Sequence, residues 1–90
     1  MSLTPEQQRR KKQLERNILT KPTAEAYSEL GILCYYAGEL ENAITQLKKY
    51  LKIRPNDAAV HTNLGNILSD TPRIEEAEKH YRKAVEINPN

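Results

Sequence analysis

The sequence predicts an all-helical protein, a stack of antiparallel helical hairpins with five helices in total. The main observation is an internal repeat: residues 24–56 align with residues 58–90 at an offset of 34 positions, and nine of the 33 pairs are identical. Apolar residues also recur every three or four positions, as on one face of a helix, and no alternating strand pattern occurs. Repeats of this length are typical of stacked units that bury their apolar faces against one another.

The identical residues are mostly small or turn-forming, the types that fix where helices touch and where they stop. They are Ala24/Ala58, Leu30/Leu64, Gly31/Gly65, Glu41/Glu75, Ala43/Ala77, Lys49/Lys83, Ile53/Ile87, Pro55/Pro89 and Asn56/Asn90. Gly31 and Gly65 lie inside helical patterns, where glycine costs about 1 kcal/mol relative to alanine. Because this cost is incurred twice at the same phase, we expect close backbone approach of Gly31 to Ala43 and of Gly65 to Ala77.

The first predicted element is a helix over residues 4–19. Thr4 and Gln7 form a capping-box pattern, and Pro5 suits the first helical position. Residues 8–13 carry no apolar side chain, so we expect the first half of the helix to fray and the second half to dock. The docking stripe would consist of Leu14, Ile18 and Leu19.

Two helices follow, over residues 24–37 and 40–53, and Gly38 separates them. Thr23 suits the N-cap of the first, and Asp57 would cap the helix after the pair. The apolar stripes of the two helices are Ala26, Tyr27, Leu30, Leu33, Cys34 and Ala37, and then Leu40, Ala43, Ile44, Leu47, Tyr50 and Leu51.

The second hairpin repeats this plan with a different turn. Thr71 as N-cap and Pro72 at the first helical position predict the start of the last helix. The two stripes are Val60, His61, Leu64, Ile67 and Leu68, and then Ile74, Ala77, Tyr81, Ala84 and Val85.

The spacing of these residues resembles the tetratricopeptide repeat family. A Leu-Gly pair is followed by alanine twelve residues after the glycine, by leucine or an aromatic residue four further on, and by proline eight beyond that. The two copies are Leu30, Gly31, Ala43, Leu47 and Pro55, and Leu64, Gly65, Ala77, Tyr81 and Pro89. The repeats occupy residues 24–57 and 58–90, so we expect a two-repeat domain over 23–90. Residues 1–22 lie outside this frame and are predicted to be a capping helix and linker.

One position departs from the family pattern. Tyr50 stands where the family usually has a small residue, as Ala84 does in the second repeat. We therefore expect the Tyr50 side chain either to swing outward or to widen the stacking of the helices locally.

The resemblance implies a right-handed superhelix of helical hairpins, with a concave groove that binds an extended peptide or a helix of another protein. Carried over position by position, the groove-facing residues are Glu25, Ser28, Ile32, Tyr35 and Tyr36, and then Ala59, Thr62, Asn63, Asn66, Ser69 and Asp70. The two tyrosines are the best candidates for a binding hot spot. The alternative is that one packs into the hairpin while the other covers the groove.

The predicted function is therefore non-catalytic protein–protein recognition, as a scaffold or adaptor. Family members that bind chaperones hold a C-terminal carboxylate with lysine and asparagine residues. Ser28 and Ile32 replace two of these here and only Asn63 remains, so we do not expect this carboxylate clamp. Two alternatives stay open: an accessory segment of a larger enzyme such as a transferase, or a pure homo-oligomerisation unit.

No residue pattern supports catalysis, a cofactor or a metal. No Ser/His/Asp set or glycine-rich loop occurs, and His61 and His80 lack further ligands at metal-binding spacing. Cys34 lies on an apolar stripe and is predicted to be buried rather than a nucleophile.

The distribution of charge and the cysteine content bear on the partners and the compartment of the protein. Residues 1–21 hold six Lys/Arg and two Asp/Glu, a net of +4, whereas residues 22–90 hold eight and ten, a net of −2. The basic run at residues 9–12 is interpreted as a solvated helix surface, because no aromatic residues interleave it, and by this criterion we do not expect nucleic acid as a partner. A single cysteine and no membrane-length apolar run favour a soluble cytoplasmic protein.

The last helix poses a separate question, because nothing in the sequence follows it to cover its far face. We expect either that the chain is a fragment of a longer repeat protein or that this face pairs with a second copy to form a homodimer.

Overall fold

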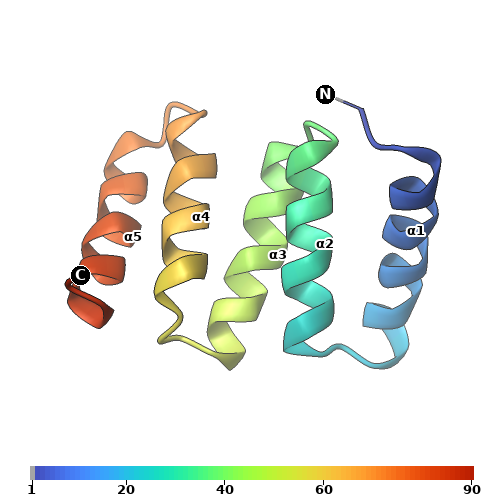
Figure 1. The fold of residues 1–90 in the computed structure, drawn as a ribbon, viewed down its shortest axis with the longest axis horizontal. Helices are drawn as coiled ribbons and strands as arrows, with labels where there is room; N and C mark the ends of the chain where they lie inside the picture. Colours follow the sequence, from blue (N-terminus) through green and yellow to red (C-terminus); the bar gives the residue numbers. More distant parts are fainter. Residues whose placement is uncertain (1) are drawn as a thin grey trace.

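The computed structural model describes residues 2–90, and it confirms the all-helical prediction. Its helices are α1 (Pro5–Thr20), α2 (Ala24–Tyr36), α3 (Leu40–Ile53), α4 (Ala58–Ser69) and α5 (Ile74–Ile87). Within residues 2–90 no strand occurs. Each helix packs mainly against the next one along the chain, so the five form one row from α1 to α5 (Figure 1). Stability in such an array comes from neighbouring interfaces rather than from one central core.

Side-chain caps start three of the helices where the sequence predicts them. Thr4 accepts a hydrogen bond from the Gln7 backbone N–H at 3.2 Å, and the Gln7 side chain accepts one from the Thr4 N–H at 3.0 Å. Thr23 caps α2 through the Ala26 N–H, and Asp57 caps α4 through the Val60 N–H. Each cap satisfies a donor that the first helical turn leaves unpaired.

The two inter-helix turns differ in mechanism. Gly38 has a φ of 81°, a left-handed conformation that glycine adopts without a steric penalty, and it reverses the chain between α2 and α3. The prediction for the second turn is wrong, because α5 begins at Ile74 and its N-cap is Arg73. The Thr71 hydroxyl instead donates to the Leu68 carbonyl at 2.6 Å and accepts from the Arg73 N–H at 3.1 Å. It therefore closes the turn instead of capping the helix.

The buried residues form a thin strip that runs through successive helix interfaces. The side chains that are largest among the fully buried ones are Leu14, Leu30, Leu47, Leu64, Ile67, Leu68 and Cys34. In α1, Leu14 is buried and Ile18 packs against the strip, but Leu19 is 83% exposed. The prediction that Leu19 docks is wrong, since one step along a helix turns the side chain by about 100°, away from the face that Ile18 shares with Leu14.

Gly31 and Gly65 occupy equivalent positions in the two repeats, and each packs closely against the other helix of its hairpin. The residues that they contact differ from those predicted. A Cβ atom on Gly31 would lie 2.8 Å from Leu47 Cδ2 and 3.5 Å from the Ala43 carbonyl oxygen. On Gly65, the three nearest atoms would all belong to the Tyr81 ring, the closest at 2.7 Å. Each glycine thus accommodates the side chain one turn beyond the predicted alanine. Of the two predicted alanine contacts, only that of Gly31 with Ala43 is found among these nearest atoms, and there it is the backbone oxygen.

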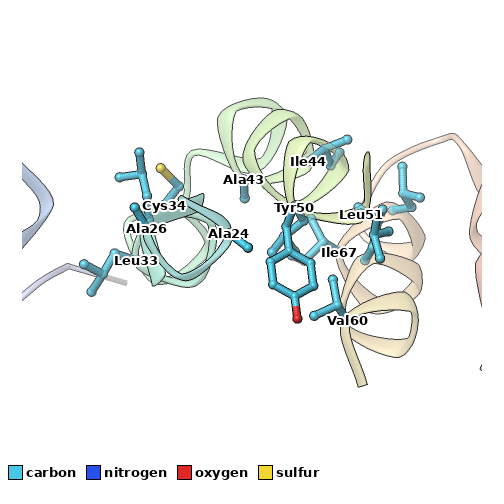
Figure 2. Packing of buried hydrophobic residues seen from close by; sticks show 14 of the residues in the cluster. Ala24, Ala26, Leu33, Cys34, Ala43, Ile44, Tyr50, Leu51, Val60 and Ile67 are labelled. Atoms are coloured by element: carbon cyan, nitrogen blue, oxygen red, sulfur yellow. The ribbon is translucent and has the colours of Figure 1, made fainter. Parts of the chain in front are cut away.

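Tyr50 lies inside the joint between the repeats, so the prediction that it swings outward is wrong. It is 6% exposed, and Figure 2 shows its ring between Ala24 of α2 and Val60 of α4. Its hydroxyl donates a short hydrogen bond to the Asp57 carboxylate, the same group that caps α4. This bond lowers the pKa of Asp57 and raises the pKa of Tyr50. The larger side chain is accommodated because its polar end has a partner at the start of the next repeat.

The glycine contacts predict unequal effects of adding a methyl group. Gly31→Ala should destabilise the protein by about 1–2 kcal/mol, because overpacking against the fully buried Leu47 outweighs the gain in helix propensity. Gly65→Ala should cost less, because Tyr81 is partly exposed and its ring can move outward. Thermal melts followed by circular dichroism at 222 nm would measure both.

The matched control is Asn63→Ala, at an exposed helical position of α4. This substitution raises helix propensity and adds no side-chain clash, so it should not lower the melting temperature. A Gly31→Ala variant as stable as the native protein would contradict the packing described above.

Candidate functional site

The residues predicted to line a groove all lie on the first helix of each hairpin or directly after it. Glu25, Ser28, Ile32, Tyr35 and Tyr36 are on α2; Ala59, Thr62, Asn63, Asn66 and Ser69 are on α4; and Asp70 follows α4. Most are exposed, whereas Ser28, Ile32 and Tyr35 are half-buried. We call this set the α2–α4 face, and its role in peptide binding stays a prediction.

Several of these side chains meet across the face. The Tyr35 hydroxyl lies 3.4 Å from a carboxylate oxygen of Asp70, which links α2 to the end of α4. The rings of Tyr35 and Tyr36 are 6.0 Å apart between centroids. Asn66 accepts a hydrogen bond of 2.6 Å from the hydroxyl of Tyr81 on α5, so its side-chain oxygen is already engaged.

Other members of the predicted set are occupied elsewhere. Glu25 forms an ion pair of 2.5 Å with Arg54, beyond the end of α3. The hydroxyls of Thr62 and Ser69 donate to backbone carbonyls of their own helix, at 3.0 and 2.7 Å. Tyr36 and Asn63 are exposed and make no side-chain hydrogen bond within residues 2–90. These two are the groups best placed to contact a ligand.

The two neighbouring tyrosines have separate environments. Tyr35 packs against the buried cluster, while Tyr36 is 44% exposed. This is the arrangement in which one tyrosine belongs to the hairpin and the other stays accessible. Of the two tyrosines Tyr36 is the more exposed, and a hot-spot role on this face stays a prediction.

Cys34 is buried as predicted. Its side chain is fully inaccessible, and burial raises the pKa of its thiol to about 11. At neutral pH the thiol is therefore protonated, and the thiolate needed for nucleophilic attack is scarce.

The basic run at residues 9–12 is partly used inside the fold. Arg10 makes a two-pronged contact with Glu29 of α2, at 2.7 and 2.8 Å, and Lys11 lies 3.1 Å from Glu39. The contact with Arg10 lowers the pKa of Glu29. Half of the run therefore ties α1 to the first hairpin, so it is not wholly the solvated surface that the sequence predicted.

The sequence did not reveal a hollow on the side formed by α3 and α5. It has a volume of about 790 Å³. Its walls are Lys48, Leu51 and Lys52 of α3 and Glu75, Glu76, Lys79, His80 and Lys83 of α5, with Pro55 and His61 between them. We call it the α3–α5 groove.

Two histidines meet beside this groove. The rings of His61 and His80 stack with centroids 5.2 Å apart, and their Nδ1 atoms are 3.0 Å apart. His61 Nε2 lies 2.8 Å from the Pro55 carbonyl oxygen. A carbonyl only accepts, so His61 Nε2 carries the proton and its Nδ1 is the acceptor. His80 therefore donates from Nδ1, which leaves its Nε2 as an unprotonated nitrogen.

Sequence spacing contained a usable signal for this pair. In an antiparallel hairpin, residues at similar distances from the turn lie opposite one another, and both histidines are about two helical turns from the α4–α5 connection. The spacing of metal ligands along the sequence could not reveal the histidine pair, because His61 and His80 lie on different helices. Among residues 2–90, no group of three or more His, Cys, Asp or Glu side chains lies close enough to hold a metal ion.

Comparison with known proteins identifies the repeats. A sequence profile described as TPR repeat matches residues 31–71, and one described as tetratricopeptide repeat matches residues 58–90. The chain belongs to the tetratricopeptide repeat family. Its fold is similar to that of the crystal structure of MamA, with a TM-score of 0.86 and 28% identity over 94% of this chain and 50% of that one.

Relatives of known name are much longer than this chain. The peroxisomal targeting signal receptor of Candida albicans is 38% identical over 66 residues, which are 73% of this chain and 11% of the receptor. A protein O-mannosyl-transferase of Caenorhabditis elegans is 32% identical over 54 residues, 60% of this chain and 8% of the transferase. The chain thus spans about a tenth of these relatives. Together, the repeats and the receptor relatives support a protein-interaction module.

None of the helices in residues 2–90 combines the length and apolar character needed to cross a membrane.

The histidine pair predicts defined tautomers and a pH effect. Long-range ¹H–¹⁵N NMR spectra above pH 7 should show His61 protonated at Nε2 and His80 at Nδ1. Burial, together with the neighbouring His61, lowers the pKa of His80 below its usual 6.5. The unfolded chain then binds the proton more readily, so folding stability should fall as pH drops below about 6.5.

The control is His80→Gln, whose side-chain amide can still donate to His61 and should preserve the His61 tautomer. Observation of His61 with its proton on Nδ1 above pH 7 would contradict the assigned network.

Proposed function

We propose that this chain is a non-catalytic recognition module whose α2–α4 face binds an extended peptide or a helix of another protein. The observation that carries the proposal is that Tyr36 and Asn63, on the first helices of successive hairpins, are both exposed and make no side-chain hydrogen bond within residues 2–90. Support also comes from the relatives, several of which are named as receptors for a peroxisomal targeting signal.

The chemistry of the face fits recognition of a peptide backbone. An asparagine amide can donate and accept at once, as a peptide bond does, and a tyrosine offers apolar area at a small entropic cost. None of the residues that define this face is Lys or Arg, and Ser28 and Ile32 stand at two of the clamp positions. We therefore propose that the ligand is held by its backbone and side chains rather than by a terminal carboxylate.

Two further questions are whether these repeats belong to a larger enzyme and in which compartment they act. Because the chain spans about a tenth of its named relatives, a role as accessory repeats of an enzyme is the competing function, and the transferase relative favours it. A catalytic domain encoded in the same open reading frame would decide for the enzyme. We place the module in the cytoplasm, on the ground that its single cysteine leaves no internal disulfide.

Substitutions on the α2–α4 face should weaken peptide binding. Peptides selected from a random twelve-residue display library would be measured by fluorescence anisotropy against the native protein, Tyr36→Ala and Asn63→Ala. We expect each variant to lose about fivefold to thirtyfold in affinity, as truncation of an interface anchor typically costs 1–2 kcal/mol. Neither should change the melting temperature greatly.

Lys12→Ala, on the exposed surface of α1, is the control and should bind as the native protein does. If the selected peptides bind all four proteins equally, the α2–α4 face is not the recognition surface.

A second candidate function is self-association through α5. Val85 is 60% exposed and Ile74 is 48% exposed, and a hollow of about 360 Å³ between α4 and α5 is lined in part by Val85, Tyr81 and Ala84. The positions equivalent to Val85 and Ala84 in the first repeat are Leu51 and Tyr50, which α4 covers. Repeat symmetry therefore favours another helix on this face, supplied by a second copy.

Sedimentation velocity over a range of micromolar concentrations tests this candidate. We expect reversible dimerisation that Val85→Glu weakens by about tenfold or more, because it buries an unpaired charge in the contact. Leu19→Glu makes the same kind of change on the exposed side of α1 and serves as the control. A monomer at all concentrations, or equal effects of both variants, would exclude the α5 dimer.

A further inference from the structure

The α3–α5 groove shares no residue with the α2–α4 face and has the size of a binding site. Its volume of about 790 Å³ falls within the 300–1,000 Å³ typical of ligand pockets. Leu51 and Pro55 give it an apolar strip, while the groups along its walls are mostly charged. Nothing in the proposed peptide recognition by α2 and α4 uses these residues.

The groove carries an excess of positive charge in a part of the chain that is acidic overall. Four lysines and two glutamates line it, whereas residues 22–90 have a net charge of −2. Glu76 is neutralised by Lys48 at 2.6 Å and by Arg73 at 2.8 Å. Its pKa is lowered by these contacts, with the bond from Lys48 the largest cause.

The remaining lysines are available to a ligand. Lys52 and Lys79 make no ion pair within the described residues 2–90, and the contact of Lys83 with Glu86 is long, at 3.9 Å. Against these three cations the groove presents one further carboxylate, Glu75. The local balance therefore favours an anionic occupant.

The spacing of the lysines favours a chain-like anion over a compact one. Lys79 and Lys83 are four residues apart on α5, which places them about 6 Å apart along the helix axis. Alternate side chains of an extended peptide repeat at about 6.6–6.8 Å, so successive carboxylates can meet successive lysines. Lys52 stands on the opposite wall. A single small anion would reach only part of this set.

The histidine pair adds a group that can respond to the ligand. His80 Nδ1 is held by His61, so any further proton is taken up at His80 Nε2 without breaking the pair. A protonated Nε2 would then donate to a carboxylate, a charge-assisted hydrogen bond. In the empty groove, burial and the neighbouring His61 and Lys48 disfavour this proton, and Glu76 favours it.

We propose that the α3–α5 groove binds an acidic peptide segment of a partner protein. Carboxylates of the segment contact Lys52, Lys79 and Lys83, and an apolar side chain between them packs on Leu51 and Pro55. This site is separate from the α2–α4 face, so the module can hold two segments at once.

Fluorescence anisotropy with a labelled Glu-Glu-Leu-Glu-Glu peptide at about 50 mM NaCl tests the proposal, because charge screening is weak at this ionic strength. We expect saturable binding, and at least tenfold weaker binding of the matched Gln-Gln-Leu-Gln-Gln peptide. The double variant Lys52→Glu/Lys79→Glu should lose about tenfold in affinity. The control Lys12→Glu/Lys21→Glu changes the net charge equally, at exposed positions in α1 and just after it, and should retain most of the binding.

Three further measurements distinguish the α3–α5 groove from the α2–α4 face and from a site for small anions. Tyr36→Ala should bind the acidic peptide normally, because Tyr36 lies on the α2–α4 face. The His80 ring signals should shift in NMR spectra on addition of the peptide. Inorganic phosphate at equal concentration should not displace it. Equal binding of both peptides, equal loss in both double variants, or displacement by phosphate would overturn the proposal, provided that melting curves show all variants folded.

Discussion

Close packing within each hairpin is the constraint on which the rest of the structure depends. Gly31 leaves space for Leu47, and Gly65 leaves space for Tyr81, so in both hairpins a helix position without a side chain receives a large one from the partner helix. The cost of glycine in a helix is offset because the paired helices approach closely enough to bury a continuous strip. The distance between the paired helices in turn fixes where the outward-facing side chains of each hairpin lie.

The joint between the repeats carries this geometry along the chain. Tyr50 fills the space between α2 and α4, and its hydroxyl binds the Asp57 carboxylate that caps α4. One carboxylate thus sets both where the second repeat begins and how it sits on the first. His61 contributes from the other side, because its bond to the Pro55 carbonyl fixes the same connection. These bonds fix the position of α4 relative to the end of α3.

The two long surfaces of the stack differ in chemistry, as the alternation of helices allows. First helices present Tyr36 and Asn63, which are neutral, while second helices and the histidine pair form a groove with excess lysine. Membership of the tetratricopeptide repeat family accounts for the stack, but side chains off the shared framework decide what each surface can bind. The two surfaces therefore differ in charge, and the two proposed ligands differ for that reason.

The sequence alone determined the helices, their caps at Thr4, Thr23 and Asp57, and the repeat of 34 residues, because these follow from local propensity and periodicity. It did not determine which side chains meet between helices. Tyr50 proved buried between α2 and α4, and His61 and His80 became adjacent only once antiparallel packing had set their register. A helical pattern fixes the face on which a residue lies, whereas its partner depends on the distance and rotation of another helix, which only the tertiary structure decides.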